Sequence, residues 1–174
     1  MKKQLTIGID VGGTNTVLGL IDRDGNCLAR TDFHTQRSTN EDGPVFFDEY
    51  MDLLYAAIEK LLAEVPEDAK VEGIGIGAPN ANYYKGAIIN AANLTWRDRS
   101  KPSKERLGEF EKQNRCEVVK LLKKRFPAIK AIAMTNDANA AALGELYYGG
   151  GKHLKRKDLV EITLGTGLGS GFVS

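Results

Sequence analysis

A glycine-rich turn near the N-terminus, Val11-Gly12-Gly13-Thr14, most narrows the folds open to this chain. Residues Leu5 to Ile9 alternate before it, and a second apolar run, Val17 to Ile21, follows it. Both runs are predicted strands, because alternating apolar residues are typical of half-buried strands. The turn therefore joins strand to strand. This order excludes a dinucleotide-binding fingerprint, in which the glycine-rich turn joins a strand to a helix.

Asp10 and the turn residues Gly12, Gly13 and Thr14 predict a site for phosphate and a metal ion. Glycines present backbone N–H groups with no Cβ in the way, and Thr14 adds a hydroxyl donor. A carboxylate at the end of a strand, here Asp10, can hold a hydrated Mg²⁺. A plain glycine hairpin is the alternative explanation.

Further along the chain, predicted strands alternate with predicted helices. Cys27 to His34 is a third strand candidate, and Phe47 to Leu62 carry apolar residues at helical spacing, with Pro44 suited to the first turn and Pro66 ending the helix. The later elements are a buried strand at 71–78, a charged, partly helical segment at 97–112, a helix at 116–125, a strand at 131–134, an alanine-rich helix from 135–137 to 149–151, and a strand at 159–164. A β-meander followed by this alternation predicts an α/β domain with a mixed sheet.

A second glycine loop, Gly165-Thr166-Gly167-Leu168-Gly169, follows the last of these strands and precedes another. It offers backbone donors and the Thr166 hydroxyl to an anion. Two such loops can hold a polyphosphate from two sides, which predicts two related lobes facing one ligand, whereas a structural hairpin is the alternative. The first glycine turn is no Walker loop, because the Gly-Lys pair that follows glycines, Gly151-Lys152, is followed by His153 instead of serine or threonine.

Asn136 and Asp137 open the alanine-rich helix and have two explanations. As an N-cap, their side-chain oxygens accept the free N–H groups of the first helical turn. Beside a bound nucleotide, the Asp137 carboxylate would sit where an alcohol loses its proton, or would orient that hydroxyl.

Amides and one indole lie in two predicted loops, Gly77 to Asn80 and Asn90 to Trp96. Amides hydrogen-bond hydroxyl groups and an aromatic face covers C–H surface, so these loops suit recognition of a polyhydroxylated molecule. The alternative is ordinary turn chemistry with a buried tryptophan.

Composition excludes several classes of function. The chain has 174 residues with 24 Lys+Arg against 23 Asp+Glu, so its net charge of +1 provides no field to attract nucleic acid or an acidic membrane. Two distant cysteines, Cys27 and Cys116, can form neither a disulfide framework nor a zinc site. His34 and His153 have no partner at metal or triad spacing. No run approaches the length of a membrane span, which predicts a soluble cytoplasmic protein.

Five motifs in order resemble the ROK family of bacterial sugar kinases and sugar-responsive repressors. They are Ile9-Asp10-Val11-Gly12-Gly13-Thr14-Asn15, Gly75-Ile76-Gly77-Ala78-Pro79, Asn93-Leu94-Thr95-Trp96, Asn136 to Glu145, and Leu164 to Gly169. The resemblance covers nearly the whole chain. It implies the actin-like, hexokinase-type ATPase fold, which is ribonuclease H-like, and ATP-dependent phosphorylation of a hexose such as glucose.

The same resemblance implies roles for individual residues. Asp10 would organise Mg²⁺, and Asp137 would be the catalytic base. The predicted sugar-binding residues are Ala78, Asn93, Asn136 and Asp137. The predicted ATP-binding residues are Asp10 with the first phosphate loop, Gly12, Gly13 and Thr14, and the second phosphate loop, Gly165, Thr166 and Gly167.

Departures from the family pattern modify these expectations. Members are longer and carry a second lobe, so residues 1–157 are expected to form the N-terminal ATPase lobe and 158–174 only the start of the second. The family's Glu-x-Gly-His sugar motif and its cysteine-rich zinc motif are absent, and zinc is not predicted. With the second lobe largely missing, weak or no activity of this chain alone and self-association into a homo-oligomer are expected.

Two other functions stay open. A sugar-sensing regulatory module would bind hexose without turnover, although no helix-turn-helix segment precedes Leu5. An actin-like or chaperone-like ATPase would hydrolyse ATP regardless of sugar, and the Asn93-x-x-Trp96 and Asn136-Asp137 motifs argue against it.

Overall fold

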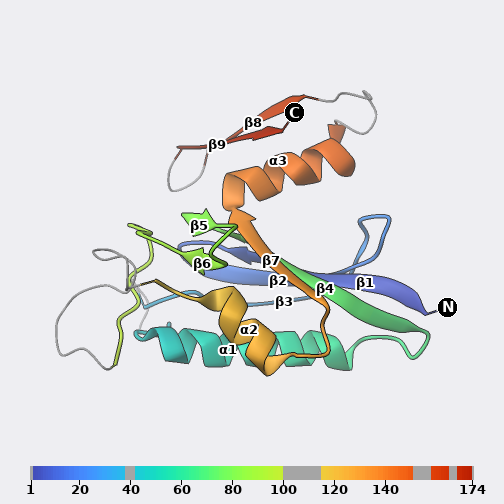
Figure 1. Cartoon of the computed structure of the whole chain (residues 1–174), viewed down its shortest axis with the longest axis horizontal. Coiled ribbons are helices and arrows are strands. Elements are labelled where there is room, and N and C mark those ends of the chain that lie inside the picture. Colours follow the sequence, from blue (N-terminus) through green and yellow to red (C-terminus); the bar gives the residue numbers. More distant parts are fainter. Residues whose placement is uncertain (1, 38–41, 100–114, 151–157, 165–167, 174) are drawn as a thin grey trace.

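A mixed sheet of five strands is the centre of the molecule (Figure 1). The computed structural model describes residues 2–37, 42–99, 115–150, 158–164 and 168–173. The strands are β1 (Lys3–Val11), β2 (Asn15–Ile21), β3 (Cys27–His34), β4 (Ala69–Ala78) and β7 (Ala131–Asn136), and their order is β3-β2-β1-β4-β7. β1, β2 and β3 form an antiparallel meander, whereas β1, β4 and β7 run parallel. The predicted α/β domain with a mixed sheet is confirmed.

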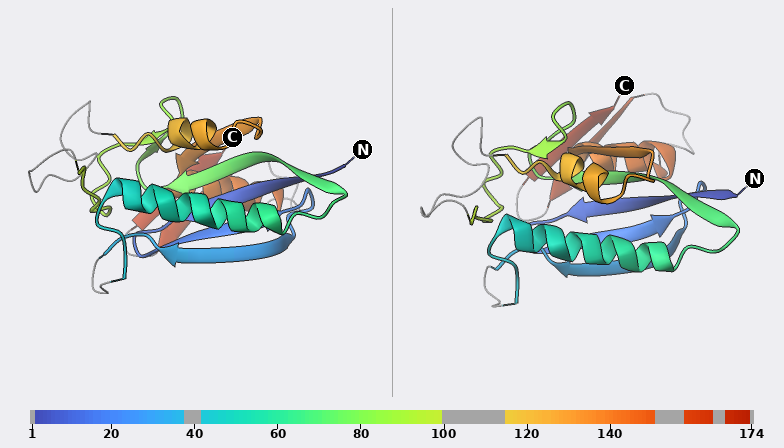
Figure 2. Two further views of the ribbon diagram at one scale, coloured as in Figure 1. Left: turned by 90° about the horizontal axis from the view of Figure 1, so that it is seen from below. Right: turned by 60° about the horizontal axis from the view of Figure 1, so that its bottom comes forward.

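Helices cover both faces of this sheet. The other elements of the described chain are α1 (Phe47–Ala63), α2 (Val118–Arg125), α3 (Asp137–Tyr147), and the strand pairs β5 (Ala81–Asn82) with β6 (Ala87–Ile88) and β8 (Leu159–Leu164) with β9 (Leu168–Val173). α1 and α2 lie on one face, and α3 lies on the other (Figures 1 and 2). No described helix is both long and apolar enough to cross a lipid bilayer.

The main core lies between the sheet and helices α1 and α2. Alternate side chains of a strand point to one face, and Leu5, Ile7, Ile9 and Val11 of β1 are all buried there. Helix α1 adds an apolar stripe at the predicted spacing, made of Tyr50, Met51, Leu54, Ala57, Ile58 and Leu61. Burial of these two sets fixes α1 against the sheet.

Helix α1 begins later than predicted, at Phe47 rather than in the turn that holds Pro44. The Glu49 carboxylate accepts hydrogen bonds from the backbone N–H groups of Val45 (2.9 Å) and Phe46 (3.1 Å). It therefore caps the helix at Phe46 and leaves Pro44 in the preceding segment.

Helix α2 also begins later than predicted, at Val118 instead of Cys116. Cys116 exchanges two backbone hydrogen bonds of 3.1 Å with Ile88, so its backbone belongs to a β-bridge. Most of the charged segment predicted at 97–112 lies outside the described residues.

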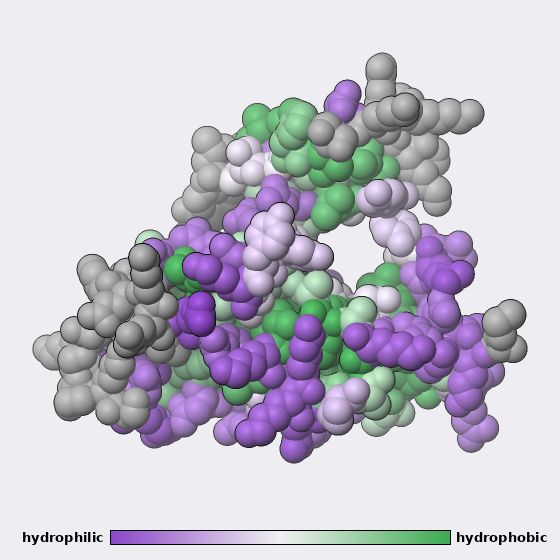
Figure 3. All heavy atoms as spheres, viewed as in Figure 1, coloured by the Kyte–Doolittle hydropathy of each residue, from purple (hydrophilic) through white to green (hydrophobic). Residues whose placement is uncertain are grey.

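Strands β8 and β9 form a hairpin that packs on helix α3 (Figure 1). Gly171 of β9 faces the helix so closely that an added Cβ would lie 2.2 Å from the Ala138 carbonyl oxygen. The opposite face of the hairpin is apolar and open, with Val160, Ile162 and Phe172 each more than 60% exposed. Figure 3 shows apolar atoms gathered in this upper part of the molecule. Such a face is typical of a surface that another element covers.

The two cysteines should differ sharply in reactivity. Cys27 is exposed, whereas Cys116 is buried and burial raises its pKa to about 12. Because the thiolate is the reactive form, we expect a thiol reagent at neutral pH to label one cysteine per folded chain and two after denaturation. Cys27→Ser should abolish the fast labelling. Rapid labelling of both thiols in the folded chain would contradict the described core.

Gly77 should tolerate a side chain far less well than Gly75 on the same face of β4. A Cβ at Gly77 would lie 3.1 Å from the Ala140 Cβ and 3.6 Å from the Asp137 Cα, whereas one at Gly75 would meet nothing within 4 Å. We expect Gly77→Val to lower the free energy of unfolding by about 1–3 kcal/mol and Gly75→Val to change it little. Urea denaturation of both variants measures this difference, and equal losses would contradict the close packing of α3 on β4.

Candidate active site

The predicted site residues converge where the three parallel strands end. In the sheet register Asp10 of β1 pairs with Gly77 of β4, which in turn pairs with Thr135 of β7. One residue further, Ala78 pairs with Asn136. Carboxyl ends of parallel strands form one edge of a sheet, and ligands bind in the crevice outside it. Residues far apart in the sequence are therefore brought to a single edge.

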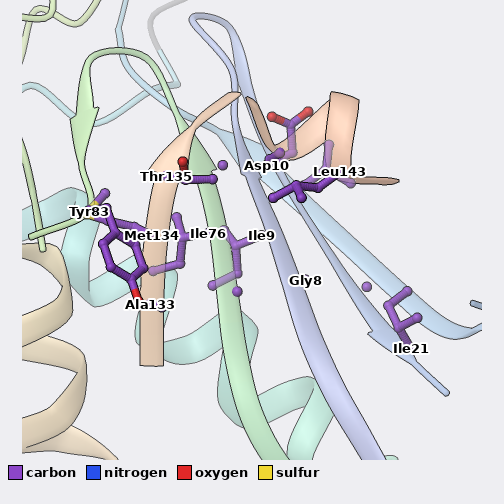
Figure 4. Close-up of a pocket in the computed structure, with 15 residues that line it drawn as sticks. Gly8, Ile9, Asp10, Ile21, Ile76, Tyr83, Ala133, Met134, Thr135 and Leu143 are labelled. Carbon is purple, nitrogen blue, oxygen red and sulfur yellow. The ribbon is translucent and has the colours of Figure 1, made fainter. Parts of the chain in front are cut away.

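Asp10 lies beside Asp137, which is in the first turn of α3. Loss of surrounding water raises the pKa of Asp10 from its ordinary value, and the negative charge of Asp137 raises it further. Figure 4 shows the Asp10 carboxylate at the end of β1 beside helix α3. A divalent cation would relieve this cost of keeping Asp10 ionised.

The donors at this edge fit Mg²⁺ bound together with a phosphate ligand. Among the described residues, no three His, Cys, Asp or Glu side chains gather into a metal site by themselves. Mg²⁺ commonly takes one or two carboxylates from a protein and completes its shell with water and substrate phosphates. Asp10 and Asp137 are carboxylates that lie beside each other at this edge.

The first phosphate loop is a tight turn held by its own backbone. The Gly12 N–H donates to the Asn15 carbonyl at 3.0 Å, and a Cβ on Gly12 would lie 2.8 Å from that oxygen. Glycine is therefore required at this position. The Gly12 amide is committed to the turn, and phosphate binding by this loop stays a prediction. Gly13 is half-buried and Thr14 is exposed.

Both side chains at the start of α3 act as caps. The Ala138 N–H donates to Asn136 Oδ1 at 3.1 Å and to Asp137 Oδ1 at 2.8 Å. The N-cap explanation is thus confirmed for Asn136. Asp137 remains exposed at the edge of the sheet, so capping and a chemical role are compatible.

The two predicted sugar loops lie together, but two of their residues, Ala78 and Trp96, are buried and cannot contact a ligand. Asn80 and Asn90 both have positive φ, 50° and 54°, and Asn80 Nδ2 donates to the Asn90 carbonyl at 2.6 Å. Asn93 is exposed, and its amide nitrogen would lie 3.8 Å from a Cβ on Gly13. Ala78, in contrast, is fully buried and offers no surface to a ligand.

Trp96 is a core residue, so the expectation that its face covers a sugar is wrong. Its side chain is 1% exposed, and its Nε1 donates to the Thr35 carbonyl at 2.7 Å. Its ring packs against that of Tyr50 with centroids 4.0 Å apart. The alternative explanation, a turn with a buried tryptophan, is the one that the structure supports.

Sequence reasoning missed Gln36, a buried polar residue that joins the first phosphate loop to the 93–96 loop. Its Nε2 donates to the carbonyl oxygens of Gly13 (2.7 Å) and Asn93 (2.8 Å). Its Oε1 accepts from the N–H (2.6 Å) and the hydroxyl (2.9 Å) of Thr95. A glutamine followed by arginine and serine has the pattern of an exposed loop, and no local signal distinguishes it.

A cavity of about 650 Å³ adjoins this edge on the α3 side of the sheet (Figure 4). Its floor is made of small residues on neighbouring strands, and Asp10 lies at its end. The small residues of the floor are Gly8, Gly19, Gly75, Gly77 and Ala133. Leu143 of α3 and Tyr83 line its other sides.

The second phosphate loop stays a prediction. Gly165, Thr166 and Gly167 lie outside the described residues. The flanking strands β8 and β9 are present and antiparallel, as the strand-turn-strand pattern predicted.

Comparison with known proteins identifies the family. A model of the ROK family matches residues 6–174. The glucokinase of Streptomyces coelicolor is 34% identical over 169 residues, which are 97% of this chain and 43% of that protein. The xylose repressor of Caldicellulosiruptor bescii is 27% identical over 184 residues, which cover 95% of this chain and 41% of the repressor.

A solved structure of a glucokinase has the same fold as this chain. The ROK family glucokinase of Streptomyces griseus, in complex with glucose and AMPPNP, superposes with a TM-score of 0.70 at 29% identity, covering 97% of this chain and 44% of the glucokinase. The fold is therefore that of the actin-like ATPases, as expected, and the chain spans less than half the length of these two glucokinases. This chain belongs to the ROK family.

Proposed function

We propose that this chain is the N-terminal part of a sugar kinase that transfers a phosphoryl group from Mg-ATP to a glucose-like hexose. The observation that carries the proposal is the convergence of Asp10, the Gly12–Thr14 turn, Asn93 and Asn136-Asp137 at one edge of the sheet. Support also comes from relatives named glucokinase and from the fold neighbour that holds glucose and AMPPNP.

In this proposal Asp137 is the catalytic base and Asn136 and Asn93 bind sugar hydroxyls. The reacting hydroxyl gives its proton to the Asp137 carboxylate, its oxygen bonds to the γ-phosphorus, and the bond from that phosphorus to ADP breaks. Capping of α3 fixes one Asp137 oxygen on the Ala138 N–H, which orients the carboxylate. Asp10 would hold Mg²⁺, which neutralises phosphate charge.

The division of the chain follows from the same proposal. Residues 1–157 would form the ATPase lobe with the sugar loops, and 158–174 the start of the second lobe with Gly165, Thr166 and Gly167 as its phosphate loop. The open apolar face of β8 and β9 is consistent with elements that belong against it. A homo-oligomer and a cytoplasmic location remain predictions.

A regulatory module that binds hexose without turnover is the second candidate. The similarity to a xylose repressor favours it, because the repressor matches nearly the whole of this chain. The two candidates share the sugar site and differ in whether ATP is consumed.

ADP release from Mg-ATP over a panel of hexoses tests the proposed kinase. We expect slow release that depends on glucose or a similar hexose, and a loss of at least about 100-fold in Asp137→Asn, because the base is removed while the shape is kept. Asp52→Asn on α1 is the matched control, since Asp52 is exposed on the opposite face of the sheet and should leave the rate unchanged.

Each other outcome of this assay favours a different function. ADP release that ignores sugar would contradict the proposal and favour a general ATPase. The regulatory module would be favoured if a chain that includes the second lobe binds glucose in calorimetry but releases no ADP from Mg-ATP with any hexose.

Asp10→Asn should stabilise the ligand-free protein while it weakens Mg-nucleotide binding. The pKa of Asp10 is raised above 3.8, so ionisation of Asp10 costs stability; this cost sets in above the unfolded pKa and is complete above the folded pKa. We expect the variant to raise Tm at neutral pH and to raise it less as the pH falls toward the unfolded pKa, because Asp10 then becomes protonated. Asp32→Asn on β3 is the control. A pH-independent gain would contradict the raised pKa that loss of water and the charge of Asp137 give to Asp10.

A further inference from the structure

Gln36 lies two residues after the end of β3 and is 7% exposed, and its whole side-chain amide is hydrogen-bonded. A glutamine side chain has two N–H donors and an oxygen with two lone pairs. The two donors go to the carbonyls of Gly13 and Asn93, and both lone pairs are taken by Thr95. Exchange of oxygen and nitrogen would set an oxygen against two carbonyl oxygens, so the orientation of the amide is fixed.

The backbone beside Gln36 makes the same connection. The Thr35 N–H donates to the Thr14 carbonyl at 2.8 Å, and the Thr35 carbonyl accepts from Trp96 Nε1 at 2.7 Å. Thr35 thus touches the first phosphate loop on one side and the 93–96 loop on the other. A Cβ on Gly43 would lie 2.1 Å from the Gln36 carbonyl oxygen, so the backbone at Gly43 packs closely against the backbone of Gln36.

We propose that Gln36 is a positioning residue that holds the Gly12–Thr14 turn and the 93–96 loop in one fixed relation. On the proposed function, the first segment faces nucleotide phosphate and the second, through Asn93, faces the hexose. Ordering either loop then orders the other through one buried amide, and binding of a triphosphate and of a sugar is coupled. The link between the loops is independent of the kinase activity, whereas the identity of the ligands rests on it.

Amide hydrogen exchange of this chain without ligand tests the link directly. Gln36→Glu keeps the acceptor for Thr95 but places a carboxylate oxygen against the carbonyls of Gly13 and Asn93. We expect protection of residues 12–15 and 93–96 to fall together by about tenfold or more, while strands β1 and β4 keep theirs. Gln4→Glu is the matched control, because Gln4 is exposed at the opposite end of β1 and should alter neither loop.

A second pair of variants tests the link without changing Gln36. Thr95→Val removes the hydroxyl that donates to Gln36, and Thr95→Ser keeps it. We expect Thr95→Val to reduce protection in the 12–15 turn, which Thr95 reaches through Gln36, and Thr95→Ser to preserve it. This pair remains informative if Gln36→Glu does not fold.

Calorimetry with glucose and AMPPNP as the probes tests whether sugar binding and nucleotide binding are coupled through Gln36. AMPPNP should tighten glucose binding severalfold in the original chain and leave it unchanged in Gln36→Glu. Unchanged protection of both loops in Gln36→Glu and in Thr95→Val, or loss in one loop alone, would overturn the positioning role. Absence of binding of either probe with a clear effect on exchange would instead count against the proposed function and leave the link intact.

Discussion

The parallel pairing of β1, β4 and β7 is the constraint on which the rest of the site depends. Its register places the ends of three strands level with one another, so that Asp10, Gly77 and Thr135 share one row. The glycine in the middle of this row leaves space for the start of α3. A side chain there would push the helix away, and Asp137 would leave the neighbourhood of Asp10.

Local patterns were sufficient to predict most of this framework. The strands at 27–34 and 159–164 have the predicted bounds, since the turn at 22–26 precedes the first and a glycine loop follows the second in the sequence. The predicted grouping of Asp10 with Asn136-Asp137 also follows from local signals, since each lies at the end of an apolar run and parallel strands end at one edge. The starts of α1 and α2 were predicted less well, because the Glu49 side chain caps α1 at Phe46 and a β-bridge to Ile88 holds Cys116 in extended backbone, and apolar spacing marks neither contact.

Long-range contacts account for what the sequence did not reveal. Trp96 in a loop could cover a ligand or fill the core, and only its packing against Tyr50 distinguishes the two. Gln36 has the local pattern of a surface residue, and its burial depends on loops 23 and 57 residues away in sequence. Polar residues of this kind hold distant loops together with little trace in hydrophobic periodicity.

Helix α3 is anchored at the end that carries Asp137. Its first turn is anchored against Gly77, and its length carries the β8–β9 hairpin. A helix of 11 residues is about 16 Å long, so a tilt of about 10° around the anchored end shifts the far end by about 3 Å. The Asp137 carboxylate, at the anchored end, moves far less. Because Gly171 of the hairpin packs on Ala138 in this first turn, the hairpin meets the helix beside Asp137, at the end that moves least.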